Sequence, residues 1–308
     1  MKTPLVSICI PAYNHERFIQ DCIRSVMDQD YGNIELLVID DGSSDRTWPR
    51  ILELRPECER RFARVVMETR ANRGRAETLR ELYRLASGDL VGDIASDDLY
   101  LPGAIAALAA PFSADRARGL VVGVNVLVDA DGRRCFWDRR RQVVYSYATA
   151  AYATFDAWLE KRHGISMDGE EFGDYRRLLR ANHVPNGSLK RRSMCDLGSL
   201  YDAGAPLEDW WFHLQFSKVA KYRHIPQETF CYRWHGENTA VREAYMLDAA
   251  RKTLRREAEK VEASSGEWKL AYESAVPWFR RQVLFRCPIG LLWPLWRSWR
   301  FLAGKDRP

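Results

Sequence analysis

Four short apolar runs mark residues 1–110, and each is followed by a segment with the spacing of an amphipathic helix. Such runs are typical of strands that are buried on both faces of a parallel sheet. They predict strands at 6–10, 34–39, 64–67 and 90–94 and helices at 16–27, 45–54, 76–86 and 102–110. We expect Ser43 or Ser44 to cap the second helix. The repetition with short turns predicts an α/β fold with a mostly parallel, doubly wound sheet.

The pattern becomes more varied after residue 118. Apolar runs predict strands at 120–128, 135–137, 184–189, 221–225 and 230–234, and helical spacing predicts helices at 154–162, 208–218 and 239–263. No internal repeat or low-complexity linker interrupts the sequence. We therefore expect two halves of one α/β domain, 1–118 and 119–240, followed by a C-terminal helical extension at 241–308.

Polar clusters follow each of the four strands predicted in the first half. They occupy residues 11–14, 40–44, 68–74 and 95–98. Ligands of open parallel sheets bind outside the carboxyl ends of the strands, which is where all four clusters should lie. The first of these clusters contains no Gly-x-Gly-x-x-Gly motif, which argues against a dinucleotide cofactor.

Two of these clusters contain adjacent carboxylates, and a third contains a tyrosine. Asp97 and Asp98 could bind a hard divalent cation and a ribose hydroxyl, or one of them could cap the next helix. Asp41, beside Gly42, could accept a hydrogen bond from a base, or it could simply belong to a turn. Tyr13 could stack on a planar base or cover the edge of the sheet.

Taken in order, these clusters resemble the pattern of the inverting glycosyltransferases of family 2, which have the GT-A fold. The resemblance is close over residues 5–105 and looser to about residue 240. It rests on residues 6–14, 40–47, 72–74, 86–89 and 96–98. It implies that residues 1–118 form the nucleotide-sugar-binding half of a GT-A domain and residues 119–240 the acceptor-binding half.

The resemblance also implies which residues bind the donor nucleotide. Pro11 and Tyr13 correspond to the wall around the base, and Asp41 corresponds to the carboxylate that reads the base, commonly uracil. Asn72 and Gly74 belong to the next motif near the nucleotide. The implied donor is a nucleoside-diphosphate sugar, with a UDP-sugar favoured.

Metal binding is implied by the acidic pair and by a later segment. Asp97 matches the position that faces the ribose and the metal shell, and Asp98 matches the ligand of Mn²⁺ or Mg²⁺. His235 matches a residue that can complete the metal or diphosphate site, although a histidine in a loop can equally be a surface residue. Three arginines are candidate contacts of the diphosphate: Arg73, Arg75 and Arg233.

The general base implied by the resemblance is Asp209, in the segment Leu-Glu-Asp-Trp at 207–210. An inverting transfer needs one base to take the proton of the acceptor hydroxyl. Asp209 lies at the start of a predicted helix, where the helix N-terminus favours an ionised carboxylate. Without the upstream motifs, the same residue would be interpreted as a charge at the start of an amphipathic helix.

The chain departs from the family pattern at two places. Residues 78–80 read Thr-Leu-Arg where the family has an Ala-Arg-Asn-like stretch, and Ala95 stands where a third acid is usual. The sequence also lacks a Gln-x-x-Arg-Trp motif and any apolar run of membrane-spanning length, which argues against a processive synthase. We therefore expect transfer of a single sugar to a hydroxyl of a glycan or of a lipid-linked acceptor.

Positive charge is concentrated near the C-terminus. The chain has a formal charge of +5, and residues 277–308 contain seven basic residues, one acid and four tryptophans. Tryptophan and arginine on an amphipathic helix are typical of the lipid interface. We expect this segment to bind an anionic membrane surface; a helix docked on the domain is the alternative. The near-neutral remainder of the chain argues against a nucleic-acid partner.

Cysteine usage and the N-terminus indicate the compartment. The seven cysteines are scattered and form no Cys-x-x-Cys, which indicates a reducing environment. No signal-peptide pattern precedes the first strand, so we expect a cytoplasmic protein that is peripheral on the inner membrane face. Two other functions remain open: a sugar-phosphate nucleotidyltransferase, which should carry a Gly-rich phosphate loop after the first strand, and an inactive GT-A-fold module tethered to the membrane.

Overall fold

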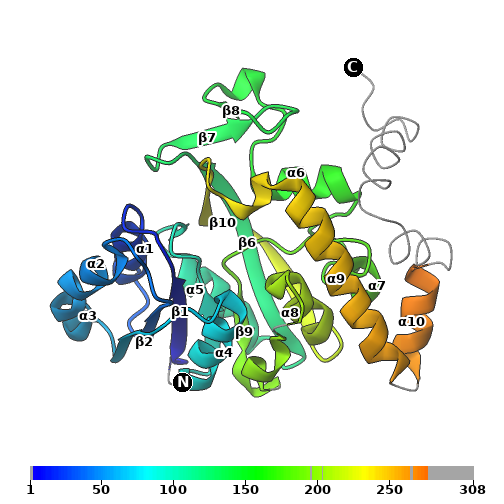
Figure 1. Cartoon of the computed structure of the whole chain (residues 1–308), viewed down its shortest axis with the longest axis horizontal. Helices are drawn as coiled ribbons and strands as arrows, with labels where there is room; N and C mark the ends of the chain where they lie inside the picture. The colour runs from blue at the N-terminus through cyan, green and yellow to red at the C-terminus, as the bar shows by residue number, and fades with distance from the viewer. Residues whose placement is uncertain (1–2, 195, 203, 264–265, 277–308) are drawn as a thin grey trace.

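The computed structural model describes residues 3–194, 196–202, 204–263 and 266–276. These residues form one mixed α/β domain around a ten-stranded sheet (Figure 1). The main path of the sheet runs in the order β3-β2-β1-β4-β9-β6-β10-β5, and β7 and β8 extend it from β6. The predicted C-terminal membrane-binding segment, 277–308, lies outside the described residues.

The first half of the sheet is parallel, as predicted. β1 pairs with β2 and β4, and β2 pairs with β3. Its strands are β1 (Val6–Ala12), β2 (Ile34–Asp40), β3 (Arg64–Thr69) and β4 (Leu90–Asp93). Its helices are α1 (Ile19–Met27), α2 (Thr47–Glu53), α3 (Arg55–Arg61), α4 (Arg75–Leu85) and α5 (Ala104–Ala109). The predicted serine cap of the second helix is wrong, because the Asp45 carboxylate accepts the N–H of Thr47 at 2.9 Å.

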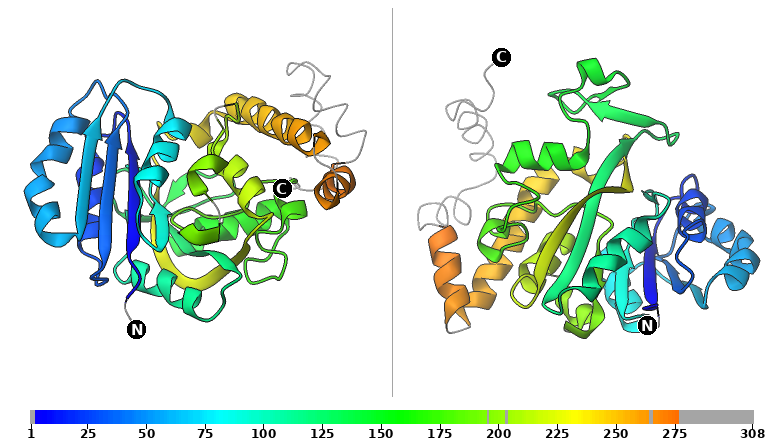
Figure 2. Two further views of the ribbon diagram at one scale, coloured as in Figure 1. Left: turned by 90° about the horizontal axis from the view of Figure 1, so that it is seen from below. Right: turned by 180° about the vertical axis from the view of Figure 1, so that it is seen from behind.

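The second half curls away from the first around two long strands (Figure 2). β6 (Arg118–Val128) and β10 (Lys221–Arg233) are parallel, and the short β9 (Leu189–Arg191) joins them to β4 in antiparallel fashion. The two strands predicted at 221–225 and 230–234 are one strand, β10, with register shifts around Glu228. Pro226 lacks an N–H, so it interrupts the ladder of hydrogen bonds without ending the strand.

The remaining elements surround these strands. The short strands are β5 (Leu99–Tyr100), β7 (Arg134–Trp137) and β8 (Val143–Val144). The α-helices are α6 (Phe155–His163), α7 (Tyr175–Leu178), α8 (Glu208–Phe216), α9 (Glu243–Glu262) and α10 (Glu267–Ala275). The 3₁₀ helices are η1 (Ala110–Ser113), η2 (Tyr147–Thr149), η3 (Arg192–Met194), η4 (Leu197–Leu200) and η5 (Thr239–Val241). Across the described residues, no helix combines the length and apolar character needed to span a bilayer.

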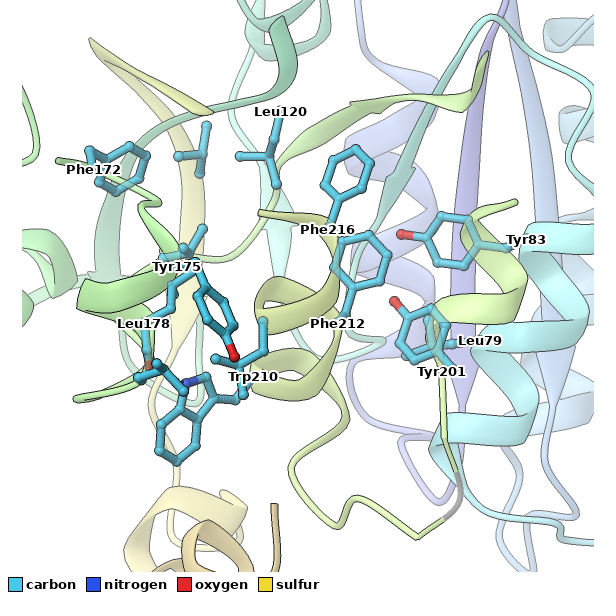
Figure 3. Close-up of a cluster of buried hydrophobic side chains, with 14 of the residues drawn as sticks. Leu79, Tyr83, Leu120, Phe172, Tyr175, Leu178, Tyr201, Trp210, Phe212 and Phe216 are labelled. Atoms are coloured by element: carbon cyan, nitrogen blue, oxygen red, sulfur yellow. The ribbon is translucent and has the colours of Figure 1, made fainter. Parts of the chain in front are cut away.

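Alternate residues of the central strands enter two separate cores. On β1, Ile8 and Ile10 pack with α1, α2 and α3, whereas Cys9 faces α4 and α8. In the second core, Phe212 of α8 stacks on Tyr83 of α4, with ring centroids 6.1 Å apart (Figure 3). This packing positions the first turn of α8, which carries Asp209, beside the parallel half of the sheet.

A buried carboxylate anchors α9 against this core. Glu257 has no exposed surface, and it accepts hydrogen bonds from the Tyr175 hydroxyl (2.5 Å), Gln215 Nε2 (2.6 Å) and Lys218 Nζ (2.6 Å). Burying a charge is costly unless partners of this kind satisfy it. The network therefore links α9 to α7, to α8 and to the turn that follows α8.

Candidate active site

A cleft of about 3470 Å³ lies along the carboxyl ends of β1, β2 and β4 and continues between α4, α6 and α8. Nine of the predicted site residues line it: Pro11, Tyr13, Asp41, Asn72, Gly74, Asp97, Asp98, Asp209 and Arg75. The sequence placed the first seven at the ends of strands, and tertiary packing brings Asp209 of α8 to the same cleft.

Loops after β2 and β3 are tied together by Asp41. Its carboxylate accepts the backbone N–H groups of Arg73 and Gly74, each at 2.9 Å, and forms an ion pair with Arg70. Gly42 has φ +74°, and a Cβ there would lie 2.8 Å from the backbone nitrogen of Asn72, so only glycine allows this close approach. Both Asp41 oxygens already accept hydrogen bonds, and a base that binds Asp41 would have to share them.

The loop after β1 presents Tyr13 to the cleft. Tyr13 is 49% exposed, so part of its side chain is accessible to a ligand. The neighbouring Asn14 has φ +51°, and its side-chain oxygen accepts the N–H of Ser44 at 2.8 Å. Hydrogen bonds between these loops therefore hold the Tyr13 backbone beside the loop that carries Asp41.

The two members of the acidic pair after β4 differ in exposure and in partners: Asp98 is 2% exposed, whereas the Asp97 side chain is 13% exposed. Asp98 accepts the backbone N–H of Arg233 at 2.8 Å, and Asp97 Oδ2 lies 3.1 Å from His235 Nε2. Burial and the adjacent Asp97 raise the pKa of Asp98 well above the usual aspartate value. Burial would also raise the pKa of Asp97, but the hydrogen bond with His235 and the nearby His15 lower it.

Sequence reasoning missed His15, which lies beside the acidic pair. Its Nδ1 is 2.7 Å from Ser96 Oγ and 4.0 Å from Asp97 Oδ1, and its ring meets the His235 ring edge-on. Burial lowers the pKa of His15, which favours its neutral form. Its position directly after the Pro-Ala-Tyr-Asn cluster was the available signal, because that cluster was already expected at the ligand edge.

Arg233 was predicted to contact a diphosphate, but its guanidinium points into the protein. The side chain is 1% exposed; Nε donates to the Asp97 carbonyl at 2.7 Å and Nη1 to the Ala130 carbonyl at 3.1 Å. It also stacks over Phe18, with its guanidinium carbon 5.0 Å from the ring centroid. The structure therefore places Arg233 behind the acidic pair, where it supports the backbone that presents Asp97 and Asp98.

The donor set here is suited to a hard divalent cation, although it is incomplete. Asp97 and Asp98 offer carboxylate oxygens, the ligands that Mn²⁺ and Mg²⁺ prefer, and His235 Nε2 lies 3.1 Å from Asp97 Oδ2. Within the part of the chain that the structure describes, no three His, Cys, Asp or Glu side chains are already arranged as a metal site. A cation held by the acidic pair would therefore need ligands from a bound molecule.

Asp209 lies in the first turn of α8, as predicted. Its Oδ2 accepts a hydrogen bond from Asn182 Nδ2 at 3.0 Å. The carboxylate is exposed to the cleft, yet protein surrounds it, and this loss of water raises its pKa despite the opposing charge of Arg75. The helix N-terminus was expected to favour ionisation, but desolvation has the larger effect and makes Asp209 a stronger base.

Arg75 is the cation between the two acidic regions. Its Nε lies 2.9 Å from Glu208 Oε1, next to Asp209. Burial acts to lower the pKa of Arg75, but the carboxylates of Glu208, Asp209, Asp93 and Asp97 raise it. Among the arginines predicted to contact the diphosphate, Arg75 lines the cleft, whereas Arg233 is turned away from it.

A buried charge pair in the cleft wall was also missed. Lys190 of β9 forms an ion pair with Asp93 of β4, and the Tyr83 hydroxyl donates to Asp93 at 2.7 Å. Burial would raise the pKa of Asp93, but Lys190, Tyr83 and Arg75 lower it. The signal in the sequence was an aspartate and a lysine inside two apolar runs, since such residues are seldom buried without a partner.

Together, the fold and the site define the class of protein. The domain has the GT-A fold, with an acidic pair at the end of β4 and an aspartate of α8 in one cleft. Residues 7–175 match the sequence model described as glycosyl transferase family 2, and the chain belongs to this family. This membership separates it from the sugar-phosphate nucleotidyltransferases.

Curated relatives include much longer polysaccharide synthases. The chain is 32% identical over 241 residues to a chondroitin synthase of Escherichia coli, covering 78% of this chain and 30% of the synthase. It is 25% identical over 241 residues to a hyaluronan synthase of Pasteurella multocida, covering 78% of this chain and 22% of the synthase. The chain therefore spans less than a third of the length of these relatives.

Solved structures share the fold at low sequence identity. Residues 1–349 of Staphylococcus aureus TarS, in complex with UDP-GlcNAc, superpose with a TM-score of 0.62 at 16% identity, covering 91% of this chain and 73% of that chain. The mannosyltransferase PcManGT of Pyrobaculum calidifontis, in complex with GDP-Man and Mn²⁺, gives a TM-score of 0.58 at 15% identity, covering 98% and 81%. At these identities the likeness concerns the fold alone.

Proposed function

We propose that this chain is a metal-dependent, inverting glycosyltransferase that moves one sugar from a nucleoside-diphosphate donor to an acceptor hydroxyl. The observation that carries the proposal is the presence of the acidic pair, Asp97 and Asp98, and of Asp209 in one cleft. The first two can hold the donor while the third receives a proton from the acceptor. Family membership supports the same reaction.

In the proposed transfer, Asp209 acts as the general base. Its raised pKa makes its carboxylate a better proton acceptor than that of an ordinary aspartate. Asn182, at 3.0 Å, orients the carboxylate. The acceptor oxygen attacks the anomeric carbon from the Asp209 side as its proton moves to the carboxylate, and the nucleoside diphosphate leaves on the opposite face. One displacement inverts the anomeric configuration.

On the donor side, we assign the binding of the nucleobase to the wall formed by Pro11 and Tyr13, with Asp41, Asn72 and Gly74 beside it. Tyr13 is partly exposed and can stack on the base. Uracil, and hence a UDP-sugar, is favoured, because a carboxylate such as Asp41 can accept from its imide N–H. Arg75 lines the cleft and is the candidate cation for the diphosphate.

Asp98, with Asp97 and His235 beside it, would hold Mn²⁺ or Mg²⁺. When bound, such a cation supplies charge neutralisation for the departing diphosphate, whose oxygens could complete its coordination. The buried Arg233 would keep the acidic pair in place through its contacts to the Asp97 carbonyl and the Asp98 carboxylate.

The acceptor is proposed to be a glycan or a lipid-linked glycan, used without processive polymerisation. The part of the chain relevant to membrane attachment, residues 277–308, lies outside the described structure, and its binding to an anionic membrane on the inner face remains a prediction. Flotation with anionic vesicles, using the full chain and a chain ending at residue 276, tests it. Equal flotation of both would contradict membrane binding.

The transfer itself is tested by donor hydrolysis, in which water replaces the acceptor. We expect the wild type to release UDP from a UDP-sugar in the presence of Mn²⁺, and Asp209→Asn to be about 10²–10⁴-fold slower with donor affinity retained. The matched control is Asp202→Asn, which changes a nearby aspartate that pairs with Arg256 outside the cleft. Unchanged turnover in Asp209→Asn would contradict its assignment as the general base. Full activity after chelation would contradict the proposed metal dependence.

A further inference from the structure

The part of the cleft bordered by α6, α7 and the turn between β7 and β8 is strongly basic. Between residues 138 and 180, the residues that line it include one acid, Asp138, and seven cations. These cations are Arg139, Arg140, Arg141, Lys161, Arg162, Arg177 and Arg180. The strand-end part of the cleft has the opposite character, since four aspartates line it between residues 11 and 98.

The one acid in the basic part is already engaged. The Asp138 carboxylate accepts the backbone N–H groups of Arg140 and Gln142, each at 2.8 Å, and so forms part of the β7–β8 turn. Arg177 pairs with Glu171, which is not among the residues that line the cleft. The remaining balance of charge at this end of the cleft is positive, which attracts an anion.

Aromatic rings form a platform beside these cations. Trp158 of α6 and Trp234, after β10, both line the cleft and are half-buried. Each packs edge-on against the buried Trp137, with ring centroids 5.9 Å and 4.7 Å away. Phe155 stacks on Trp158, with ring centroids 5.5 Å apart, and Arg162 lies over the same ring, so the rings are fixed in position. The part of the rings that stays exposed to the cleft is an apolar surface that suits the C–H face of a sugar ring.

Arg141 joins the charge to the aromatic platform. Its guanidinium carbon lies 5.8, 5.2 and 5.3 Å from the ring centroids of Trp137, Trp158 and Trp234. Its backbone has φ +61°, a left-handed conformation that costs an L-residue energy and suits glycine better. The turn therefore places an arginine at a strained position beside the aromatic rings of the cleft.

We propose that the acceptor is an anionic glycan whose sugar packs on Trp158 and Trp234 while its negative group is bound by Arg141 and the adjacent Arg139 and Arg140. A planar guanidinium can donate two parallel hydrogen bonds to a phosphate or carboxylate. Repulsion by the strand-end aspartates keeps this group away from the donor, and so orients the acceptor. The proposal rests on the proposed function, because it names the acceptor class of the same cleft.

Two sources of the negative charge share this chemistry, a diphosphate that links the sugar to a lipid and the carboxylate of a uronic acid. Binding is measured by isothermal titration calorimetry, because the chain has 11 tryptophans and its fluorescence would not report on Trp158 and Trp234 alone. The probes are a short-chain polyprenyl diphosphate N-acetylglucosamine and a glucuronate-terminated oligosaccharide, each compared with a neutral counterpart. The counterparts are the short-chain prenyl glycoside and the carboxyl-reduced oligosaccharide.

The test variant is Arg141→Gly, because glycine accepts φ +61° and the turn should keep its fold. We expect it to weaken binding of at least one anionic probe about tenfold, or about 1.4 kcal/mol, while its neutral counterpart is unaffected. Arg60→Gln, which removes an exposed arginine of α3 outside the cleft, should leave all four affinities unchanged. An unchanged melting temperature of Arg141→Gly confirms that the turn is intact.

The probe that responds identifies the source of the charge. The proposal would be overturned if the wild type bound neutral and anionic probes with equal affinity. It would also be overturned if Arg141→Gly lowered the affinity for both members of each pair equally, or for neither. Binding needs no turnover, so these outcomes differ from a failure of the proposed transfer, which would be seen as absence of donor hydrolysis by the wild type.

Discussion

The buried pair of Lys190 and Asp93 provides a test of the electrostatics in the cleft wall. The Lys190 side chain is 4% exposed and that of Asp93 is 22% exposed. Replacing Lys190 by methionine keeps the length of the side chain and removes the charge. Asp93 then retains the Tyr83 hydroxyl at 2.7 Å but no cation in direct contact.

Loss of one partner from a buried ion pair costs about 3–5 kcal/mol. The partial exposure of Asp93 reduces this cost, and we expect Lys190→Met to lower the free energy of unfolding by about 3 kcal/mol, a large part of the ~5–15 kcal/mol of a typical domain. In the double variant with Asp93→Asn, both charges are absent and Tyr83 keeps an acceptor. The double variant should therefore recover to within about 1 kcal/mol of the wild type.

The measurement is urea unfolding followed by circular dichroism, at pH 7 and at about pH 4.5. In the wild type the pKa of Asp93 is lowered, so its stabilising effect is complete above the ordinary aspartate pKa and is lost only below it. In Lys190→Met the pKa of Asp93 should rise, and protonation of Asp93 at pH 4.5 should reduce the loss in free energy of unfolding relative to the wild type. A loss that is equal at both pH values, or a double variant no more stable than the single one, would refute this reasoning.

Three further predictions follow from the site and its support. As the pH is lowered, activity should be lost at a pH above the ordinary pKa of an aspartate, because the pKa of Asp209 is raised. Arg75 lowers the pKa of Asp209, so Arg75→Met should move this acid limb of the pH profile to higher pH. An acid limb of kcat/KM at the same pH in both proteins would contradict the prediction. Asp98→Asn should abolish the increase in melting temperature that UDP with Mn²⁺ gives the wild type, and a retained increase would exclude Asp98 as a ligand. Glu257→Ala should cost about 3 kcal/mol in urea unfolding, because it leaves the Lys218 charge without its partner; no loss would mean that water replaces the carboxylate.

The sequence predicted the parallel half of the sheet well, because strands buried on both faces require continuous apolar runs. It was less successful where pairing depends on distant segments. The antiparallel β9 begins at Leu189, where the predicted strand ends, and Pro226 made one bulged strand look like two. Register and bulges depend on partner strands, and a local pattern does not contain that information.

By itself, the sequence determined the family, the positions of the four strands of the parallel half along the chain and the edge at which the polar clusters gather, because the carboxyl ends of parallel strands share one edge. Only the tertiary structure decided which charged groups face the cleft. Arg73, Arg75 and Arg233 were all candidates for the diphosphate, and Arg233 was the one assigned to the site. Arg233 is buried, however, with its backbone N–H bound to Asp98 at a separation of 135 residues. Burial and partners across such separations set both the direction of a side chain and its pKa, and they exist only once the chain has folded.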